Sequence, residues 1–254
     1  MNKKGTSLCF FSAKGGVGKT TNILNLAGVI SGLEKKVLVI DFDLYTGCVA
    51  KYLNKTFTKN VISLCEDMEN NRYEKLTDYV VNVNNNIDIL CAPIDPRHAN
   101  KINIRYVPDI ISMAKLEYDV VLIDTNHALD ACNLCILESV DKILFMTSND
   151  IMDLSNIKSL LTIFNKLDIK NYKVLLNNSR DPYKNYLNVS EIENVLGCKI
   201  DYYLTPEMFL KDMDRYVMDG SIMSLDKSFS STMTNDYRTF VRMATDLFEV
   251  NEDE

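Results

Sequence analysis

The residues best suited to chemistry form a glycine-rich loop near the amino end of the chain. The run from Ala13 to Thr21, AKGGVGKTT, follows an apolar segment and opens a stretch with helical spacing. Glycines let a backbone curl so that its N–H groups point at phosphate oxygens, and the start of a helix adds a positive dipole. The run therefore predicts a phosphate-binding loop, in which Lys19 neutralises the β- and γ-phosphates and the Thr20 hydroxyl ligates Mg²⁺.

This loop fits the pattern G-x-x-x-x-G-K-[ST], except that Ala13 replaces the first glycine. A dinucleotide fingerprint fits less well, because Thr21 stands where the third glycine of that motif would be. A glycine-rich turn without a ligand is the alternative. The residues predicted to contact phosphates are Lys14, Gly15, Gly16, Val17, Gly18, Lys19, Thr20 and Thr21.

With the extra Lys14 inside it, the run KGGVGKTT resembles the deviant Walker A ATPases, which include the ParA, MinD, CpaE/TadZ and nitrogenase iron-protein relatives. The resemblance extends from about Ser7 to Asp246. It implies a magnesium-dependent ATPase that dimerises around ATP, with Lys14 reaching the phosphates of the other subunit and stabilising charge during phosphoryl transfer. The alternative is that Lys14 is a solvated loop lysine.

Two apolar, strand-like runs end in acidic residues. Val37–Asp41 is followed by Asp43, and Asp119–Asp124 ends in a single acid. Carboxylates at these strand ends face the phosphate crevice of an open α/β sheet. The resemblance assigns Asp43 to orienting the attacking water and Asp41 to supporting the magnesium shell. It assigns Asp124, the acid of a Walker B strand, to holding Mg²⁺ opposite Thr20. Turn formation is the alternative for the first two acids.

The base of the nucleotide is expected near two later strand ends. By resemblance, Asn177 contacts adenine, and Pro206 lies in a second loop close to adenine. A guanine site would need Asn-Lys-x-Asp, but the fourth residue counted from Asn177 is Arg180, so ATP is favoured over GTP. A helix cap or turn is the alternative for Asn177.

The residues after Asp124 depart from the Asp-Thr/Ser-Pro sequence that is usual in the family. Asn126 and His127 follow Thr125 instead. In the family this segment is the second of two switch segments, and the departure leaves open which conformation it adopts here and when it changes. His127 could sense phosphate or could be a polar loop residue. A nucleotide-binding scaffold with little hydrolysis is therefore one alternative function.

Cys132 and Cys135 form a C-x-x-C pair that suggests a second alternative. Some relatives hold an iron–sulfur cluster between subunits, and two cysteines per chain would need two more from another subunit. The function would then be that of a cluster carrier or a reductase-like relative. The apolar neighbours Leu134, Ile136 and Leu137 favour a packed helix instead.

Charge and composition restrict the partners and the location. The formal net charge is −7, and eleven of the acidic residues lie between Thr205 and Glu254. Nucleic-acid binding is not expected, because it requires a basic footprint. No apolar stretch is long enough to span a bilayer, and the acidic tail argues against a grip on anionic lipid. Seven cysteines, an odd number, indicate reduced thiols and a cytoplasmic protein.

The elements that position these residues alternate between apolar runs and amphipathic stretches, which predicts a mostly parallel sheet covered by helices on both faces. We expect Gly32 to cap the helix that begins at Lys19, and Ser190 and Glu193 to form a capping box. The segment Lys51–Val83 is expected to hold short helices and an edge strand. The predicted strands are Ser7–Phe11, Val37–Asp41, Ile87–Cys91, Asp119–Asp124, Lys142–Thr147, Tyr172–Asn177 and Lys199–Leu204.

These features predict a single deviant Walker A ATPase domain over residues 1–254, in a three-layer P-loop NTPase fold with a twisted sheet of seven or eight strands. The expected activity is slow, partner-stimulated ATP hydrolysis by an ATP-dependent homodimer. Its expected role is to position or assemble a cellular machine, together with a protein partner. The stretch from Ile192 to Gly220 resembles CpaE/TadZ-type pilus-assembly ATPases, which points to a pilus or secretion system.

Overall fold

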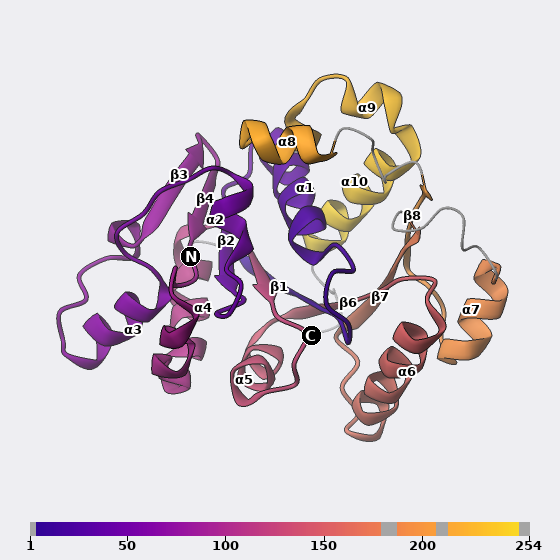
Figure 1. The fold of residues 1–254 in the computed structure, drawn as a ribbon, viewed down its shortest axis with the longest axis horizontal. Helices are drawn as coiled ribbons and strands as arrows, with labels where there is room; N and C mark the ends of the chain where they lie inside the picture. The colour runs from indigo at the N-terminus through magenta and orange to yellow at the C-terminus, as the bar shows by residue number, and fades with distance from the viewer. Residues whose placement is uncertain (1–3, 179–186, 207–212, 249–254) are drawn as a thin grey trace.

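The computed structural model describes residues 4–178, 187–206 and 213–248 (Figure 1). Arg180, whose position argued against a guanine site, lies outside these residues. No helix within the described ranges is both long and apolar enough to cross a bilayer.

Within the described residues, eight strands form one sheet in the order β3-β4-β2-β5-β1-β6-β7-β8. Neighbouring strands are parallel, except that β3, the outermost strand on one side of the sheet, runs antiparallel to β4. The strands are β1 (Thr6–Phe11), β2 (Val37–Phe42), β3 (Val80–Asn84), β4 (Ile87–Leu90), β5 (Val120–Thr125), β6 (Lys142–Thr147), β7 (Tyr172–Asn177) and β8 (Tyr202–Leu204).

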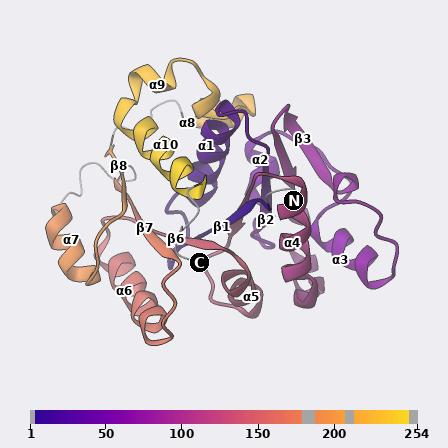
Figure 2. The same ribbon diagram turned by 180° about the vertical axis from the view of Figure 1, so that it is seen from behind.

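Helices cover both faces of this sheet, so the molecule has three layers (Figures 1 and 2). One face carries α1 (Lys19–Gly32), α2 (Cys48–Tyr52), α8 (Met213–Asp219), α9 (Phe229–Thr232) and α10 (Thr234–Phe248). The other carries α3 (Val61–Glu69), α4 (Val107–Glu117), α5 (Ala131–Ser139), α6 (Ile151–Lys166) and α7 (Val189–Leu196).

The continuous apolar strands serve two separate cores, because successive side chains of a strand point to opposite faces. In β2, Leu38 and Ile40 pack into the core beneath α3 to α7. Val37 and Val39 of the same strand pack against α1 and α10. This double burial confirms the predicted fold class.

The seven parallel strands described give the sheet two different ends, which we call the carboxyl edge and the amino edge. The loops that follow these strands lie at the carboxyl edge, and the loops that precede them lie at the amino edge. The chain leaves β1 into α1 on one face and leaves the neighbouring β6 into α6 on the other. Such a divergence opens a crevice at the carboxyl edge, where α/β sheets bind ligands.

Two local predictions are wrong. Helix α1 continues through Gly32, and the left-handed residue beyond it is Glu34, with φ 59°. The capping box of α7 is formed by Asn188 and Glu191, whose side chains each accept a hydrogen bond from the other's backbone N–H. The predicted Glu193 instead accepts hydrogen bonds from Lys199 and from the backbone N–H of Ile200.

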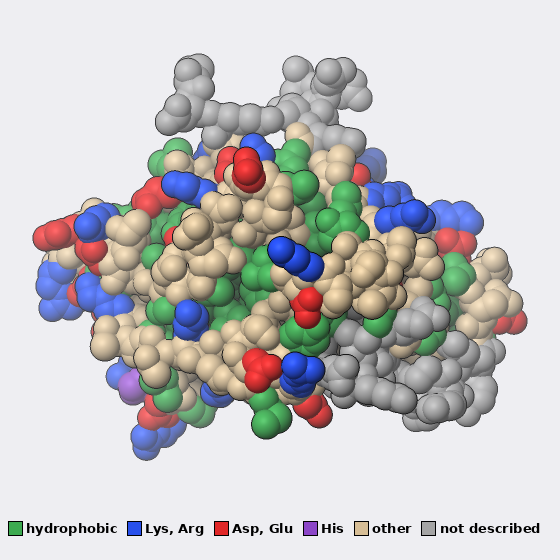
Figure 3. All heavy atoms as spheres, turned by 90° about the horizontal axis from the view of Figure 1, so that it is seen from above, with side chains coloured by type: hydrophobic (Ala, Val, Ile, Leu, Met, Phe, Trp, Pro, Cys, Tyr) green, Lys and Arg blue, Asp and Glu red, His purple; other side chains and the backbone are tan. Residues whose placement is uncertain are grey.

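Charge is mixed on the face that α8, α9 and α10 cover. Figure 3 shows basic and acidic side chains interspersed there, with hydrophobic side chains between them. On the described part of this face they do not form the continuous basic surface that binding to a phosphate backbone requires.

Candidate functional site

The predicted phosphate-binding loop joins β1 to α1 at the carboxyl edge. Gly16 and Gly18 have φ values of 74° and 96°. These lie in the left-handed region, which glycine enters without strain. Gly18 is also the N-cap of α1, so the loop curls directly onto the start of a helix. The helix dipole at that point favours a bound anion.

Lys19 is the cation of this loop, and only 8% of it is exposed. Its Nζ donates a 2.6 Å hydrogen bond to Ser12 Oγ, which in turn donates to the carbonyl oxygen of Lys14. Burial lowers the pKa of Lys19, while the charges of Asp124 and Asp43 raise it. A buried ammonium group bonded to a neutral hydroxyl would be stabilised strongly by an anion placed in the loop.

Thr20 and Asp124, two of the predicted metal ligands, are in contact. Thr20 Oγ1 donates to Asp124 Oδ2 at 2.6 Å. The other carboxylate oxygen, Oδ1, is buried and has no hydrogen-bond partner in the described part of the chain. Burial raises the pKa of Asp124 to about 6, although the bond from Thr20 and the charge of Lys19 oppose this shift. Mg²⁺ prefers hard oxygen ligands, so this residue pair fits a cation, and a cation or its water would satisfy Oδ1.

Asp41 lies beside Asp124, since the two residues are in register on the neighbouring strands β2 and β5. Its two carboxylate oxygens accept 3.0 Å hydrogen bonds from the backbone N–H groups of Asp43 and Val49. Burial, followed by the charge of Asp124, raises the pKa of Asp41 well above its usual range. Asp41 thus holds the segment from Asp43 to Val49 beside the site, and its predicted part in the magnesium shell stays a prediction.

Asp43 is half-buried and closes a turn. Its carboxylate accepts hydrogen bonds from the backbone N–H and the hydroxyl of Thr46. Its charge also raises the pKa values of Lys19 and Asp124, so the carboxylate lies close to the loop. The turn-forming alternative and a place beside the phosphates are therefore compatible for this residue.

Lys14, the extra lysine of the loop, points to its own chain. Its Nζ lies 3.4 Å from Asp150 Oδ1, and both side chains are about half exposed. Asp150 is also the N-cap of α6, where it accepts hydrogen bonds from the backbone N–H groups of Met152 and Asp153. The Lys14–Asp150 ion pair would have to open before Lys14 could reach a phosphate of another subunit.

The two residues predicted to lie near adenine are placed differently. Asn177 is buried, and its Nδ2 donates to the carbonyl oxygen of Val17 at 2.8 Å. It therefore braces the end of the loop. Pro206 is half-buried and follows β8, where the preceding Thr205 is anchored by two hydrogen bonds to Asp236. Both residues lie at the carboxyl edge, and their contact with adenine stays a prediction.

The sequence of residues 5–177 matches the protein family described as "AAA domain", AAA_31. The chain belongs to this family. An uncharacterized ATP-binding protein of Methanocaldococcus jannaschii is 27% identical to it over 147 residues. The match covers 56% of this chain and 53% of that protein, so the chain spans about half the length of this relative.

Two solved structures share the fold of this AAA domain. The ParA family ATPase from Chlorobium tepidum has a TM-score of 0.80 at 22% identity, covering 94% of this chain and 98% of that one. The septum site-determining protein MinD of Pyrococcus horikoshii, complexed with Mg-ADP, has a TM-score of 0.78 at 19% identity, covering 96% of each chain. The predicted resemblance to ParA/MinD-like P-loop ATPases is confirmed, whereas the finer CpaE/TadZ resemblance stays a prediction.

The sequence reasoning missed two residues that shape the site of this AAA domain. Ser12 holds Lys19, and Asn133 holds the turn after Asp124 through hydrogen bonds to Asn126 and Ala128. The position of Ser12, directly between β1 and the loop, was the available signal. Asn133 gave none, because it lies inside an otherwise apolar helix.

Within the AAA domain, Cys132 and Cys135 have the surroundings of packing residues, as their apolar neighbours predicted, and a cluster shared with another subunit stays an untested alternative. Cys132 is buried in the core, and the thiol of Cys135 donates to the carbonyl oxygen of Ile104. Within one chain, the described residues contain no group of three or more His, Cys, Asp or Glu side chains that could hold a metal. Burial also raises the pKa of the Cys132 thiol to about 12, which opposes the thiolate form that iron requires.

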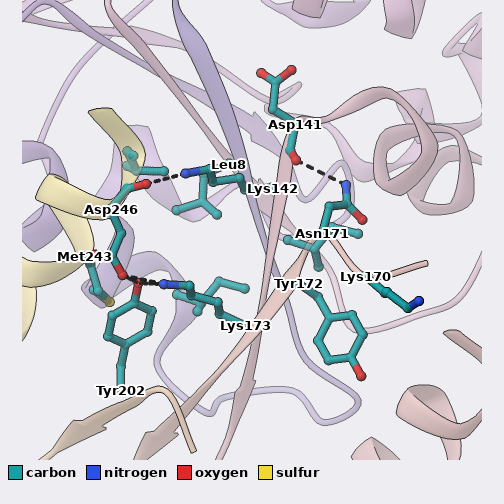
Figure 4. Close-up of a pocket in the computed structure, with 13 residues that line it drawn as sticks. Leu8, Asp141, Lys142, Lys170, Asn171, Tyr172, Lys173, Tyr202, Met243 and Asp246 are labelled. Carbon is teal, nitrogen blue, oxygen red and sulfur yellow. Dashed lines mark hydrogen bonds and ion pairs between the residues drawn. The ribbon is translucent and has the colours of Figure 1, made fainter. Parts of the chain in front are cut away.

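A second hollow, of about 280 Å³, opens at the amino edge between β6, β7, β8 and α10. Figure 4 shows Lys173 and Tyr202 directed at Asp246 on one side of it, and Asn171 bonded to the backbone of Asp141 on the other. The charged groups Lys173 and Asp246 are thus paired within the chain. None of the predicted site residues lines this hollow.

Proposed function

We propose that this AAA domain binds and hydrolyses Mg·ATP at the carboxyl edge, and that residues 1–254 act as one ATPase domain. The observation that carries the proposal is that two buried charged groups beside the loop are only partly compensated. Lys19 is buried against a neutral hydroxyl, and one buried oxygen of Asp124 has no hydrogen-bond partner among the residues that the structure describes. A polyphosphate and a hard cation would compensate both.

The chain's own residues have separate tasks in this proposal. Lys19 and the loop amides bind the phosphates, while Thr20 and Asp124 hold the cation. When bound, Mg²⁺ neutralises charge on the β- and γ-phosphates. Asp43 orients the attacking water from the turn that Asp41 holds in place. Asn177 and Pro206 flank the adenine.

We infer that the ATP-bound form is a homodimer that meets at the carboxyl edge. Large apolar side chains, between 43% and 72% exposed, lie in the loops that follow β2, β4 and β5 and in the first turn of α6. They are Tyr45, Ile94, Leu129, Ile151 and Met152. Exposed apolar groups gathered around a site mark a surface that another protein covers. In a dimer formed there, Lys14 would exchange Asp150 for a phosphate of the other subunit.

The dimer is tested with Asp43→Ala, which should bind ATP, fail to hydrolyse it and accumulate as a dimer. Size-exclusion chromatography with light scattering measures the mass with and without Mg·ATP. A variant that stays monomeric with Mg·ATP bound would contradict the proposal.

Two further variants locate the interface. Met152→Glu at the carboxyl edge should weaken the dimer, whereas Leu116→Glu should leave it unchanged. Leu116 is a matched control because its side chain is about as exposed as that of Met152, 73% against 67%. It lies at the amino edge, away from the proposed interface. Equal effects of the two substitutions would place the interface elsewhere.

We further propose that the dimer positions or assembles a cellular machine in the cytoplasm with a protein partner, and that the partner stimulates a slow hydrolysis. The resemblance of Ile192 to Gly220 to CpaE/TadZ ATPases supports a pilus or secretion system. Hydrolysis rates with and without cell extract, compared with those of Lys19→Ala, test this point. Rates equal to those of Lys19→Ala in both conditions would favour the scaffold with little hydrolysis.

A further inference from the structure

The turn between β5 and α5 is fixed by side chains that the proposed hydrolysis does not use. Asn126 Oδ1 accepts hydrogen bonds from the backbone N–H of Ala128 at 2.7 Å and from Asn133 Nδ2 at 2.8 Å. Asn133 Nδ2 also donates to the carbonyl oxygen of Ala128 at 2.6 Å. Asn133 is fully buried in α5. The residues on both sides of His127 are therefore anchored, which fixes the turn that carries His127.

The His127 ring lies against the phosphate-binding loop. Its Nδ1 and Cε1 atoms are 3.4 and 3.5 Å from the position that a β-carbon on Gly15 would occupy, so the ring lies beside this glycine of the loop. The side chain is otherwise exposed, so it is not part of the core. A polar ring held against a loop glycine, with its remaining surface open, is available to a ligand in that loop.

The contact at Gly15 also indicates which end of a nucleotide the ring would meet. Asn177, on the expected adenine side, bonds to Val17 at the opposite end of the loop. Asp124, three residues before His127, contacts Thr20, and a cation held by this pair would neutralise charge on the β- and γ-phosphates. His127 therefore lies toward the end of the polyphosphate chain and away from the base.

We propose that His127 binds the terminal phosphate of ATP and makes this site prefer triphosphate over diphosphate nucleotides. The inference rests on the proposed function and assigns its nucleotide selectivity to one side chain. An imidazole ring has at least one N–H donor in every protonation state, and a phosphate oxygen is a charged acceptor. ADP lacks the group that the ring would bind.

The first test compares the affinities of a non-hydrolysable ATP analogue, AMPPNP, and of ADP, each with Mg²⁺, by calorimetry on the full chain. His127→Ala should lower the ratio of AMPPNP affinity to ADP affinity about tenfold, as expected when a charged hydrogen bond is lost. His127→Gln keeps an N–H donor and should restore part of the ratio. His98→Ala should leave the ratio unchanged, because His98 is the other of the two histidines and its side chain is exposed in the segment Pro96–Lys101.

The outcomes separate this inference from the proposed function. If the wild-type chain binds neither nucleotide, the proposed function fails. If the wild-type chain binds both and His127→Ala keeps the wild-type ratio, the selectivity of His127 is overturned and the proposed function stands. An equal loss of AMPPNP and ADP affinity in His127→Ala would also overturn it, because His127 would then only support the loop.

The second test uses the fact that the chain has two histidines, so that two imidazole Hε1 resonances are expected in the NMR spectrum. The His98→Ala spectrum assigns them. Mg·AMPPNP should shift the Hε1 resonance of His127 by more than Mg·ADP does. Equal shifts with the two nucleotides would contradict contact with the terminal phosphate.

Discussion

The two edges of the sheet differ in how completely their charged side chains are paired. At the amino edge, Asp246 accepts hydrogen bonds from Lys173 and Tyr202, and Asp141 accepts them from Lys115 and Ser7. Burial raises the pKa of Asp246, but the bonds from Lys173 and Tyr202 outweigh it, and the pKa of this carboxyl is lowered. These carboxylates are compensated by the chain itself.

At the carboxyl edge the chain leaves comparable groups uncompensated. Lys19 bonds to a hydroxyl, one oxygen of Asp124 has no partner among the described residues, and burial raises the pKa values of Asp41 and Asp124. Perturbed, incompletely paired groups gathered in a crevice mark a functional site. The difference indicates that the amino edge stabilises the fold, and it supports the proposal that a ligand completes the carboxyl edge.

The largest effect is expected from Lys19→Ala. Because Lys19 supplies the charge that a polyphosphate would meet, Mg·ATP affinity and turnover should each fall at least about a hundredfold. Calorimetry and a phosphate-release assay measure these two quantities. Lys173→Ala at the amino edge is the control and should change neither of them. If Lys19→Ala kept the wild-type Mg·ATP affinity, the carboxyl edge would not be distinguished from the amino edge as the binding site.

Asp124→Asn should weaken Mg²⁺ dependence and, without ligand, should stabilise the fold. Because the folded-state pKa is near 6 and that of an unfolded aspartate is about 3.9, the folded state retains the proton longer. The wild-type free energy of unfolding therefore falls as pH rises from about 4 to 6. The variant lacks this loss and should gain up to about 3 kcal/mol at pH 7.

Urea unfolding at pH 4.5 and pH 7, in the absence of Mg²⁺ and nucleotide, measures this difference. The gap between Asp124→Asn and the wild-type chain should widen at the higher pH. A gap that is equal at the two pH values would mean that the buried carboxylate carries no electrostatic cost.

Asp246→Asn should have effects opposite to those of Asp124→Asn. It should destabilise the fold and leave Mg·ATP binding intact. The substitution weakens the bonds from Lys173 and Tyr202, so the free energy of unfolding should fall by about 1 kcal/mol. Mg·ATP affinity should stay within about twofold of the wild-type value, since the amino edge lies away from the loop. A large loss of Mg·ATP affinity with an unchanged free energy of unfolding would contradict this account, because the amino edge would then serve binding and not stability.

Asp150→Asn should give the smallest effect. Asparagine keeps the N-cap oxygen of α6 and removes only the charge that holds Lys14. Because exposed ion pairs contribute at most about 1 kcal/mol, the ATP-dependent dimer should tighten by no more than about fivefold. Analytical ultracentrifugation with Mg·ATP measures the dimer dissociation constant. A weaker dimer would indicate that Asp150 itself supports the interface.

The sequence was most informative where a pattern is local. The apolar runs in β2 and β5 and the loop after β1 are contiguous, so their type and order could be predicted. The capping predictions failed because a cap depends on backbone dihedral angles that the composition does not determine. Glu34 adopts the left-handed conformation in place of Gly32, and Asn188 caps α7 in place of Ser190.

Contacts between distant residues could not be predicted either. Lys14 and Asp150 are far apart in the sequence and meet because they follow the neighbouring strands β1 and β6. Asn126 and Asn133 are only seven residues apart, but their contact depends on how the turn between β5 and α5 folds. The sequence placed Lys14 in the phosphate-binding loop and left two roles open for His127, but it could not show which residues either side chain contacts. Those contacts make Lys14 a paired residue and place His127 against Gly15.

The most direct test of the account is a crystal structure of the full chain with Mg²⁺ and AMPPNP. The account predicts a phosphate oxygen in contact with Lys19 Nζ, and the cation, or one of its waters, at Oδ1 of Asp124. Nucleotide bound in the amino-edge hollow, or at any site that leaves Lys19 bonded to Ser12 and Oδ1 of Asp124 without a partner, would contradict it.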